Sequence, residues 1–87
     1  MQFEWDPAKA AANLKRHPVT FHEAAPVLDD PLSTTFPDEA HSEAEARFVT
    51  LGLSRQGTVL VVAHTERNDA IRIISARRAT RLRARIL

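Results

Sequence analysis

The chain begins with a short alternation of polar and apolar side chains and then takes on a helical pattern. Residues 2–5 alternate with the period of a strand that buries one face, so we expect their two aromatic side chains to face the core. Asp6 supplies an oxygen that caps free backbone amides, and Pro7 suits the first helical position, where a missing amide hydrogen costs nothing. The pattern therefore predicts a helix over residues 8–16, which ends before Pro18.

A second helix and a short strand follow. Thr20 can cap the backbone amide of Glu23, whose side chain can return the bond, so this capping box predicts a helix that runs to residue 28. Pro26 lies inside it, where it removes one backbone hydrogen bond and should kink or shorten the helix. Turn-forming residues then lead to an expected edge strand over residues 32–36 and to a polar, acidic loop.

The second half of the chain has the pattern of strands. Apolar and β-branched residues gather at 46–53, 58–64 and 70–76, and turn-forming segments separate them. This spacing predicts an antiparallel meander. The middle run is apolar on both faces over residues 59–62, as expected of a central strand with helices on one side and partial cover on the other.

The end of the chain returns to a helical period. Over residues 76–87, Ala79, Leu82 and Ile86 form one apolar stripe. The elements together predict a single α+β domain over residues 1–87, in which a small antiparallel β-sheet is flanked by two N-terminal helices and one C-terminal helix.

Charge is distributed unevenly along this domain. All eleven Asp and Glu residues lie between Glu4 and Asp69. Six Lys and Arg residues accompany them there, whereas the last eighteen residues carry six arginines and no acid. Such a basic end attracts phosphate groups, because a guanidinium fork can bind two oxygens at once. RNA and an acidic protein are therefore the first partners to consider.

The residue inventory excludes several classes of function. The absence of cysteine rules out disulfides and thiolate metal sites, and four histidines at scattered spacings do not favour zinc. No long apolar run predicts a signal peptide or a membrane span. We therefore expect a cytoplasmic protein that uses no cofactor and no metal and does not associate with a membrane.

Four ordered blocks of residues resemble one family. The blocks are Phe3-Glu4-Trp5-Asp6-Pro7 with Lys9 and Asn13; Lys15-Arg16-His17 before Val19-x-Phe21-x-Glu23-Ala24; Asp38-x-x-His41-Ser42-x-x-Glu45-x-Arg47; and Ile71-Arg72-Ile73-Ile74-Ser75-Ala76-Arg77. Together, over nearly the whole chain, they resemble the BrnT toxins. Those proteins are the ribonuclease halves of bacterial type II toxin–antitoxin pairs and have a RelE-like fold.

The resemblance implies a metal-independent endoribonuclease that inhibits translation and growth. RNA can cut itself when its 2′-hydroxyl attacks the adjacent phosphate, so a protein need only remove one proton, supply another and stabilise negative charge. The partners that the resemblance implies are RNA and a ribbon-helix-helix antitoxin of the BrnA type. Operator DNA would be bound only through the antitoxin complex.

A histidine, a few arginines and a carboxylate suffice for this chemistry. An ordinary imidazole gains or loses a proton near neutral pH, and His17 stands at the end of the first predicted helix beside two cations. The catalytic candidates are His17, Arg67, Arg77 and Glu45. The RNA-binding candidates are Lys15, Arg16, Arg47, Arg72 and Arg81.

Each catalytic candidate also has a purely structural interpretation. His17 can cap the carbonyl groups at the end of the helix, where a cation suits the helix dipole. Arg67 can be a solvated turn residue, and Arg77 a charge on the surface of the last helix. Glu45 can be a surface partner of Arg47, an interaction worth under about 1 kcal/mol.

The predicted last helix would also align Arg77, Arg81 and Arg85. This stripe fits a phosphate track, a seat for an acidic antitoxin segment, or the charged outer face of an amphipathic helix.

Two other functions compete with RNA cleavage. A catalytically silent member of the family would only dock its antitoxin and assist operator repression. A related toxin would act on a protein target such as gyrase, since one fold supports several activities.

Overall fold

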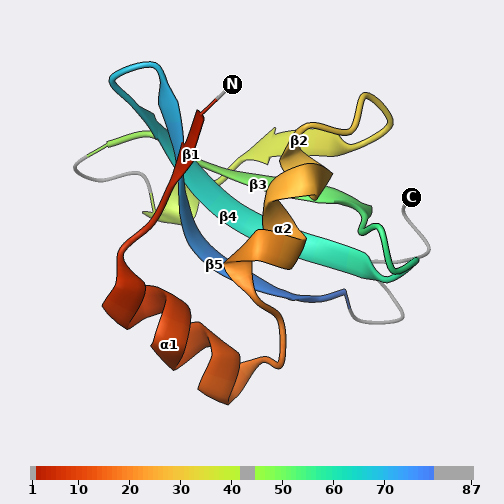
Figure 1. The fold of residues 1–87 in the computed structure, drawn as a ribbon. Helices are drawn as coiled ribbons and strands as arrows, with labels where there is room; N and C mark the ends of the chain where they lie inside the picture. Colours follow the sequence, from red (N-terminus) through yellow and green to blue (C-terminus); the bar gives the residue numbers. More distant parts are fainter. Residues whose placement is uncertain (1, 42–44, 80–87) are drawn as a thin grey trace.

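The computed structural model describes residues 2–41 and 45–79, which form a five-stranded sheet with two α-helices (Figure 1). The strands are β1 (Gln2–Glu4), β2 (Thr34–Pro37), β3 (Arg47–Leu53), β4 (Val59–Arg67) and β5 (Ala70–Arg78). The helices are α1 (Pro7–Arg16) and α2 (Phe21–Leu28), and a short 3₁₀ helix, η1, spans Glu39–His41. Helices and sheet together confirm the predicted α+β class.

Both helices begin at the predicted caps. The Asp6 carboxylate accepts a hydrogen bond from the Ala8 amide at 2.9 Å, and Pro7 takes the first helical position. The Thr20 hydroxyl accepts a hydrogen bond from the Glu23 amide at 3.0 Å. Pro26 lies within α2, which still reaches Leu28 as predicted. These local signals are accurate because each cap satisfies amides that the helix itself leaves without partners.

The sheet has the strand order β1-β5-β4-β3-β2. Strands β3 to β5 form the predicted antiparallel meander, with β4 at the centre, and β2 pairs with β3 as the expected edge strand. The expectation of a purely antiparallel sheet is wrong for β1, which pairs in parallel with β5 and sets Phe3 opposite Ile71. Alternation along residues 2–5 predicts a strand, but it carries no information on the strand's partner or direction.

The last hairpin has longer strands and a shorter turn than predicted. β4 extends to Arg67, so only Asn68 and Asp69 connect it to β5. Both have positive φ angles, of 52° and 65°. Two-residue hairpins favour this geometry because it matches the twist of the strands, and Asn and Asp tolerate it better than most residues.

The prediction of a helix from residue 76 is wrong where the structure describes it. Strand β5 continues to Arg78, and the Ala79 amide donates a hydrogen bond to the Val59 carbonyl at 2.9 Å. Ala76 lies opposite Val62 and is fully buried. Pairing with β4 and burial in the core therefore outweigh the helical preference of this segment. The remainder of the predicted helix, residues 80–87, lies outside the described residues.

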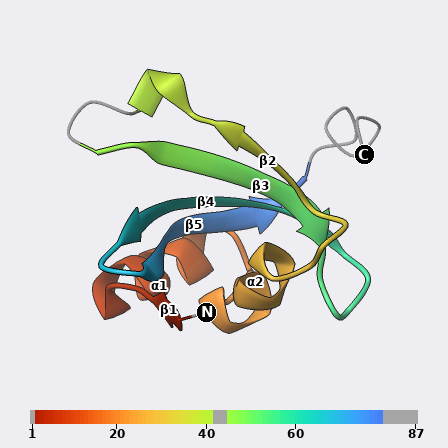
Figure 2. The same cartoon turned by 90° about the horizontal axis from the view of Figure 1, so that it is seen from above.

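The two faces of the sheet differ. Figure 2 shows α1 and α2 on the same side of the sheet, and their side chains form the core with one face of β4 and β5. This core consists of Val19, Phe21, Ala24, Val27, Leu60, Val62, Ile73 and Ala76. The opposite face, which we call the open face, is not covered by α1 or α2 (Figure 2).

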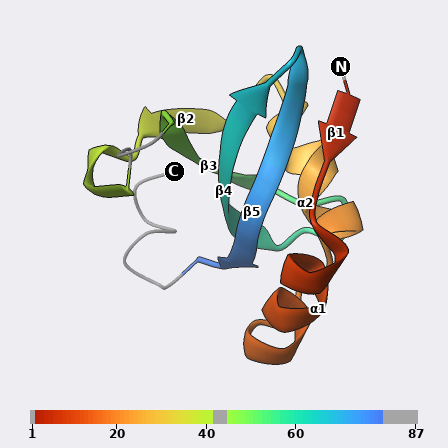
Figure 3. The same cartoon turned by 90° about the vertical axis from the view of Figure 1, so that its left-hand side faces the viewer.

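The side chain of Asn13 connects α1 to the edge of β5. β1 pairs with residues 70–72, and farther along that edge none of the described strands lies beside β5. There, Asn13 Nδ2 donates to the Ala76 carbonyl at 2.8 Å, and Asn13 Oδ1 accepts from the Ala76 amide at 3.0 Å. Nδ2 also donates to the Val19 carbonyl at 3.1 Å. Asn13 thus pairs with Ala76 as a strand residue would, and α1 lies beside β5 (Figure 3).

One histidine is buried in the sheet. His64 is 6% exposed, and its Nε2 lies 2.7 Å from the Thr50 hydroxyl, which lies 2.7 Å from the hydroxyl of Thr35. The ring stacks on Phe48, while Nδ1 has no hydrogen-bond partner among the described residues. Burial lowers the pKa of His64 below its ordinary value, and the charge of Glu66 offsets only part of this effect.

We predict that Asn13→Ala destabilises the fold by about 2–4 kcal/mol, because it leaves the buried amide and carbonyl of Ala76 without partners. The free energy of unfolding in urea measures this loss. The exposed neighbour Lys15, changed to alanine, is the matched control and should shift stability by less than about 0.5 kcal/mol. Equal effects of the two substitutions would contradict the role given to Asn13.

We also predict that stability falls as the pH drops below about 6.5, because the unfolded chain then binds a proton that the folded chain, with its lowered His64 pKa, does not. Urea unfolding of the wild type at pH 7.5 and 5.5 should show this decline. His64→Gln should remove most of it, whereas a substitution of the exposed His22 by Gln should not. An identical pH dependence in all three proteins would refute the prediction.

Candidate functional site

A hollow of about 360 Å³ lies between α1 and β5. Its walls are formed by Lys9, Ala12, Asn13, Arg16 and His17 on the helical side and by Ile74, Ser75 and Arg77 on the strand side. We call it the basic hollow, because Lys9, Arg16, His17 and Arg77 line it and none of its described lining residues carries a carboxylate.

The end of α1 positions His17 at this hollow. His17 is the C-cap residue, with an extended backbone, and its amide donates to the Asn13 carbonyl at 2.7 Å. Asn13 is in turn fixed to β5 through Ala76. His17 thus takes the C-cap position through its backbone amide, and this half-buried residue also lines the hollow.

The charge of the hollow suits an anion. Lys9 and Arg16 are two helical turns apart and share one face of α1, while Arg77 approaches from β5. A concave surface lined by one sign of charge focuses the field and raises the local concentration of the opposite ion. Guanidinium groups can hold a phosphate through two parallel hydrogen bonds. The geometry therefore fits a phosphate group that comes close to His17.

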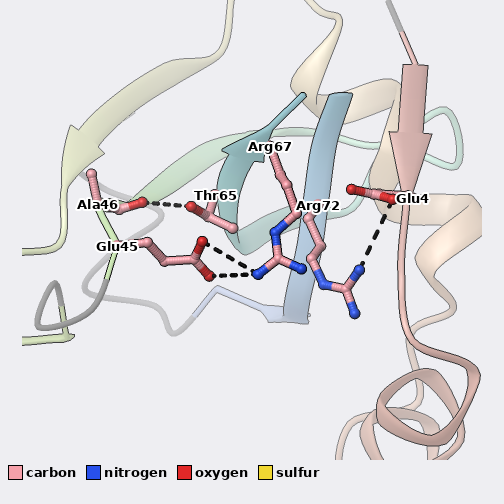
Figure 4. Close-up of polar contacts among 6 residues, drawn as sticks. All are labelled: Glu4, Glu45, Ala46, Thr65, Arg67 and Arg72. Carbon is pink, nitrogen blue, oxygen red and sulfur yellow. Dashed lines mark hydrogen bonds and ion pairs between the residues drawn. The ribbon is translucent and has the colours of Figure 1, made fainter. Parts of the chain in front are cut away.

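A second charged cluster lies at the other end of β5 (Figure 4). Arg67 Nη2 lies 3.3 Å and 3.4 Å from the two carboxylate oxygens of Glu45. The Arg72 guanidinium lies 4.0 Å from the Glu4 carboxylate, which belongs to β1 (Figure 4). The Thr65 hydroxyl donates to the Ala46 carbonyl at 2.6 Å and so holds the segment that carries Glu45.

The structure divides the four catalytic candidates into two pairs. Arg67 is opposite Ala70, and Arg77 lies seven residues farther along β5, so their backbones are roughly 20 Å apart. His17 and Arg77 therefore share the basic hollow, whereas Glu45 and Arg67 contact each other at the opposite end. The structure does not bring these two pairs together.

The RNA-binding candidates divide in the same way. Arg16 lines the basic hollow, and Lys15 is exposed nearby on α1 but is not part of its lining. Arg72 belongs to the second cluster, and Arg47 is in the same row of the sheet, because both are opposite Thr65. Arg81 lies outside the described residues.

Arg77 belongs to β5 rather than to a helix. The predicted helical stripe of Arg77, Arg81 and Arg85 is therefore wrong at its first member, and the other two members lie outside the described residues. Because Arg77 has an extended backbone, it is placed beside α1 by the register of the sheet. This place depends on pairing with β4, which the spacing of arginines in the sequence does not reveal.

Five residues of the hollow were not among the predicted site residues, and three of them have polar side chains: Lys9, Asn13 and Ser75. A signal for two of them was present, since Lys9, Asn13 and Arg16 are spaced at i, i+4 and i+7 and so share one helical face. Ser75 gave no such signal, because its place depends on an irregularity in the pairing of β5 with β4 near Ala63.

Within residues 2–41 and 45–79, no group of three or more His, Cys, Asp or Glu side chains could hold a metal ion. None of the described helices is long and apolar enough to cross a membrane.

Comparison with known proteins places the chain among the ribonuclease toxins of type II toxin–antitoxin systems. The family model described as "Ribonuclease toxin, BrnT, of type II toxin-antitoxin system" matches residues 5–82. The chain therefore belongs to the BrnT family, which confirms the resemblance found in its sequence. Membership supports ribonuclease activity in general, an RNA target and an antitoxin partner.

The fold is similar to that of a solved member of this family. The crystal structure of the Brucella abortus ribonuclease toxin BrnT, at 1.1 Å resolution, matches with a TM-score of 0.74 and 23% sequence identity. The match covers 93% of this chain and 99% of that one. No curated protein matches the chain. At this identity the likeness shows the shared fold, while the RelE-like relationship stays a prediction.

We predict that the Glu45–Arg67 pair stabilises the fold by less than about 1 kcal/mol, because both side chains are close to half exposed and water screens their attraction. A double-mutant cycle with Glu45→Gln and Arg67→Gln, followed by urea unfolding at low and high salt, measures the coupling. The coupling should shrink as salt rises. A coupling free energy above about 1 kcal/mol that does not change with salt would contradict the prediction.

Proposed function

We propose that this protein is an endoribonuclease that cleaves RNA without a metal ion, with the reacting phosphate bound in the basic hollow. The observation that supports this most directly is that His17 and Arg77 line one hollow together with Lys9 and Arg16, with no carboxylate among the lining residues that the structure describes. Membership of a family of ribonuclease toxins supports the activity, and the geometry of the hollow supports the assignment of roles.

The chemistry is a transesterification within the RNA. The 2′-oxygen attacks the adjacent phosphorus, the bond from phosphorus to the 5′-oxygen of the next nucleotide breaks, and a 2′,3′-cyclic phosphate and a 5′-hydroxyl result. The 2′-hydroxyl loses a proton, and the leaving 5′-oxygen gains one. No redox partner or other reactant is needed.

The residues of the hollow can serve this reaction. The imidazole of His17 is the group that exchanges a proton with the reacting oxygens, a contribution of about 10²–10⁴-fold. The guanidinium of Arg77 binds the non-bridging phosphate oxygens and stabilises the charge that grows on them. Arg16 and Lys9 add positive charge and hold the neighbouring backbone of the RNA.

Glu45 and Arg67 have a different place in this proposal. They contact each other at the far end of β5, and a single phosphate cannot touch both them and His17. With Arg47 and Arg72 they fit contacts to the RNA away from the cleaved bond. The proposed partner that neutralises the toxin is a ribbon-helix-helix antitoxin, which would carry operator DNA binding. Cleavage of cellular RNA would inhibit translation and growth.

We predict that purified protein cleaves bulk RNA in the presence of EDTA and that His17→Ala lowers the rate about 10²–10⁴-fold, because the proton-transfer group is lost. Arg77→Lys should also reduce the rate, because it keeps the charge but loses the two-pronged contact. His22→Gln, an exposed histidine outside the hollow, is the matched control and should retain activity. The cognate antitoxin should block cleavage.

The same assay discriminates among the other assignments. A loss in Glu45→Gln as large as that in His17→Ala would move the reaction to the other end of β5. A folded wild-type protein that cleaves no RNA, first without ribosomes and then with them, would refute the enzyme and favour the silent binding module.

A further inference from the structure

Beside the basic hollow, β5 contains one residue that has no partner in β4. The consecutive residues 63 and 64 of β4 lie opposite Ser75 and Ile73, which are not consecutive. Ile74, which lies between them, is therefore an extra residue in β5 and forms a β-bulge. Bulges are common next to functional sites, where they re-aim side chains, and both Ile74 and Ser75 line the hollow.

The bulge places Ser75 outside the core. Ile73 belongs to the core, and regular alternation would put Ser75 on the same face, with Ala76 on the other. The structure shows the reverse, because Ala76 is fully buried in the core, whereas Ser75 is partly exposed and lines the hollow. The extra residue thus keeps a hydroxyl group out of the core and places it in the strand wall of the hollow.

The Ser75 hydroxyl is available for a ligand. Apart from the imidazole of His17, the neutral polar side chains among the described lining residues are Asn13 and Ser75. Asn13 donates both of its amide hydrogens within the fold, to the carbonyl groups of Val19 and Ala76. In the part of the chain that the structure describes, the Ser75 hydroxyl has no hydrogen-bond partner. Of these two side chains, only Ser75 can therefore donate a hydrogen bond to a bound molecule.

A phosphate in the hollow needs a donor of this kind. Its non-bridging oxygens only accept hydrogen bonds, and their negative charge grows as the 2′-oxygen bonds to phosphorus. Lys9 and Arg16 approach on long side chains, whose ordering costs conformational entropy. Ser75 carries its hydroxyl on a short side chain of a strand that pairs with β4, so this donor is in place before the reaction begins.

We propose that Ser75 is a further catalytic residue, whose hydroxyl donates a hydrogen bond to a non-bridging oxygen of the cleaved phosphate. The inference rests on the proposed function, which places that phosphate in the hollow. The hydroxyl keeps its proton and forms no covalent bond, so the 2′-oxygen remains the attacking atom. Because the hydrogen bond strengthens as the charge grows, its loss lowers kcat more than it raises KM.

A purely structural role for Ser75 leads to different expectations. If its hydroxyl were only solvated, an apolar β-branched residue would suit the strand at least as well as serine. Threonine and valine have nearly the same shape and differ by one hydroxyl group. Comparison of Ser75→Thr with Ser75→Val therefore separates the loss of the hydroxyl from a change of shape.

The test measures cleavage and binding separately. Cleavage of an RNA oligonucleotide in EDTA gives kcat and KM for the wild type, Ser75→Thr, Ser75→Val and Ser75→Ala. Calorimetric titration with uridine vanadate, whose five-coordinate vanadium resembles the phosphorus of the transition state, gives a Kd that needs no cleavage. Thr34→Val is the matched control, because Thr34 is an exposed residue of β2 outside the hollow.

We expect Ser75→Val to lower kcat about 10- to 100-fold, with little change in KM, and to raise Kd for uridine vanadate by a similar factor. The loss is smaller than for a fully enclosed donor, because Ser75 is partly exposed. Ser75→Thr and Thr34→Val should stay within about threefold of the wild type in both measurements. Ser75→Ala should behave like Ser75→Val, and it decides the outcome if valine impairs folding.

An unchanged kcat in Ser75→Val and Ser75→Ala would overturn the inference and leave the proposed function intact. Equal losses in Ser75→Thr and Ser75→Val would also overturn it, because shape rather than the hydroxyl would then matter. If the wild type cleaves no RNA, the proposed function fails and the Kd for uridine vanadate decides. A rise in Ser75→Val but not in Ser75→Thr would then support the hydrogen bond to a phosphate group, and unchanged values would overturn it.

Discussion

The hydrogen bonds of Asn13 to Ala76 are the interaction on which the arrangement of this molecule depends. They join α1 to the edge of β5 at the point where β1 no longer covers that edge. Buried backbone groups without partners are strongly unfavourable, so an edge strand that enters the core needs such a partner. A side-chain amide can fill this role, because it offers a donor and an acceptor side by side like the backbone itself.

The position of the basic hollow follows from this connection. Asn13 holds the last turn of α1 in place, and the cap residue of that turn is His17. The residues one helical turn on either side of Asn13 are Lys9 and Arg16, so the helical face that contains Asn13 also carries the positive charge. One buried amide therefore explains both the attachment of α1 and the gathering of cations beside β5.

The sequence predicts those parts of the fold that local interactions determine. Asp6, Thr20 and their neighbours place both helices correctly, because a cap acts within a few residues. Features that depend on pairing with distant residues could not be predicted from the sequence. One is the parallel pairing of β1 with β5. Another is the continuation of β5 through Arg77, although alanine and arginine favour a helix. The candidate site shows the same limit, since His17 and Arg77 were identified as residue types, but only the sheet register brings them together.

The two faces of the sheet differ because strand residues alternate between them. One face is covered by α1 and α2 and supplies the buried core. The open face carries four arginines and the exposed Phe36, and its apolar residues Leu51 and Val61 are buried as well. Each of the central strands therefore contributes residues to both faces, and a shift of one residue in the pairing would exchange the two sets. The irregularity near Ala63 changes that alternation within β5, so Ala76 enters the core while Ser75 and Arg77 turn toward the hollow.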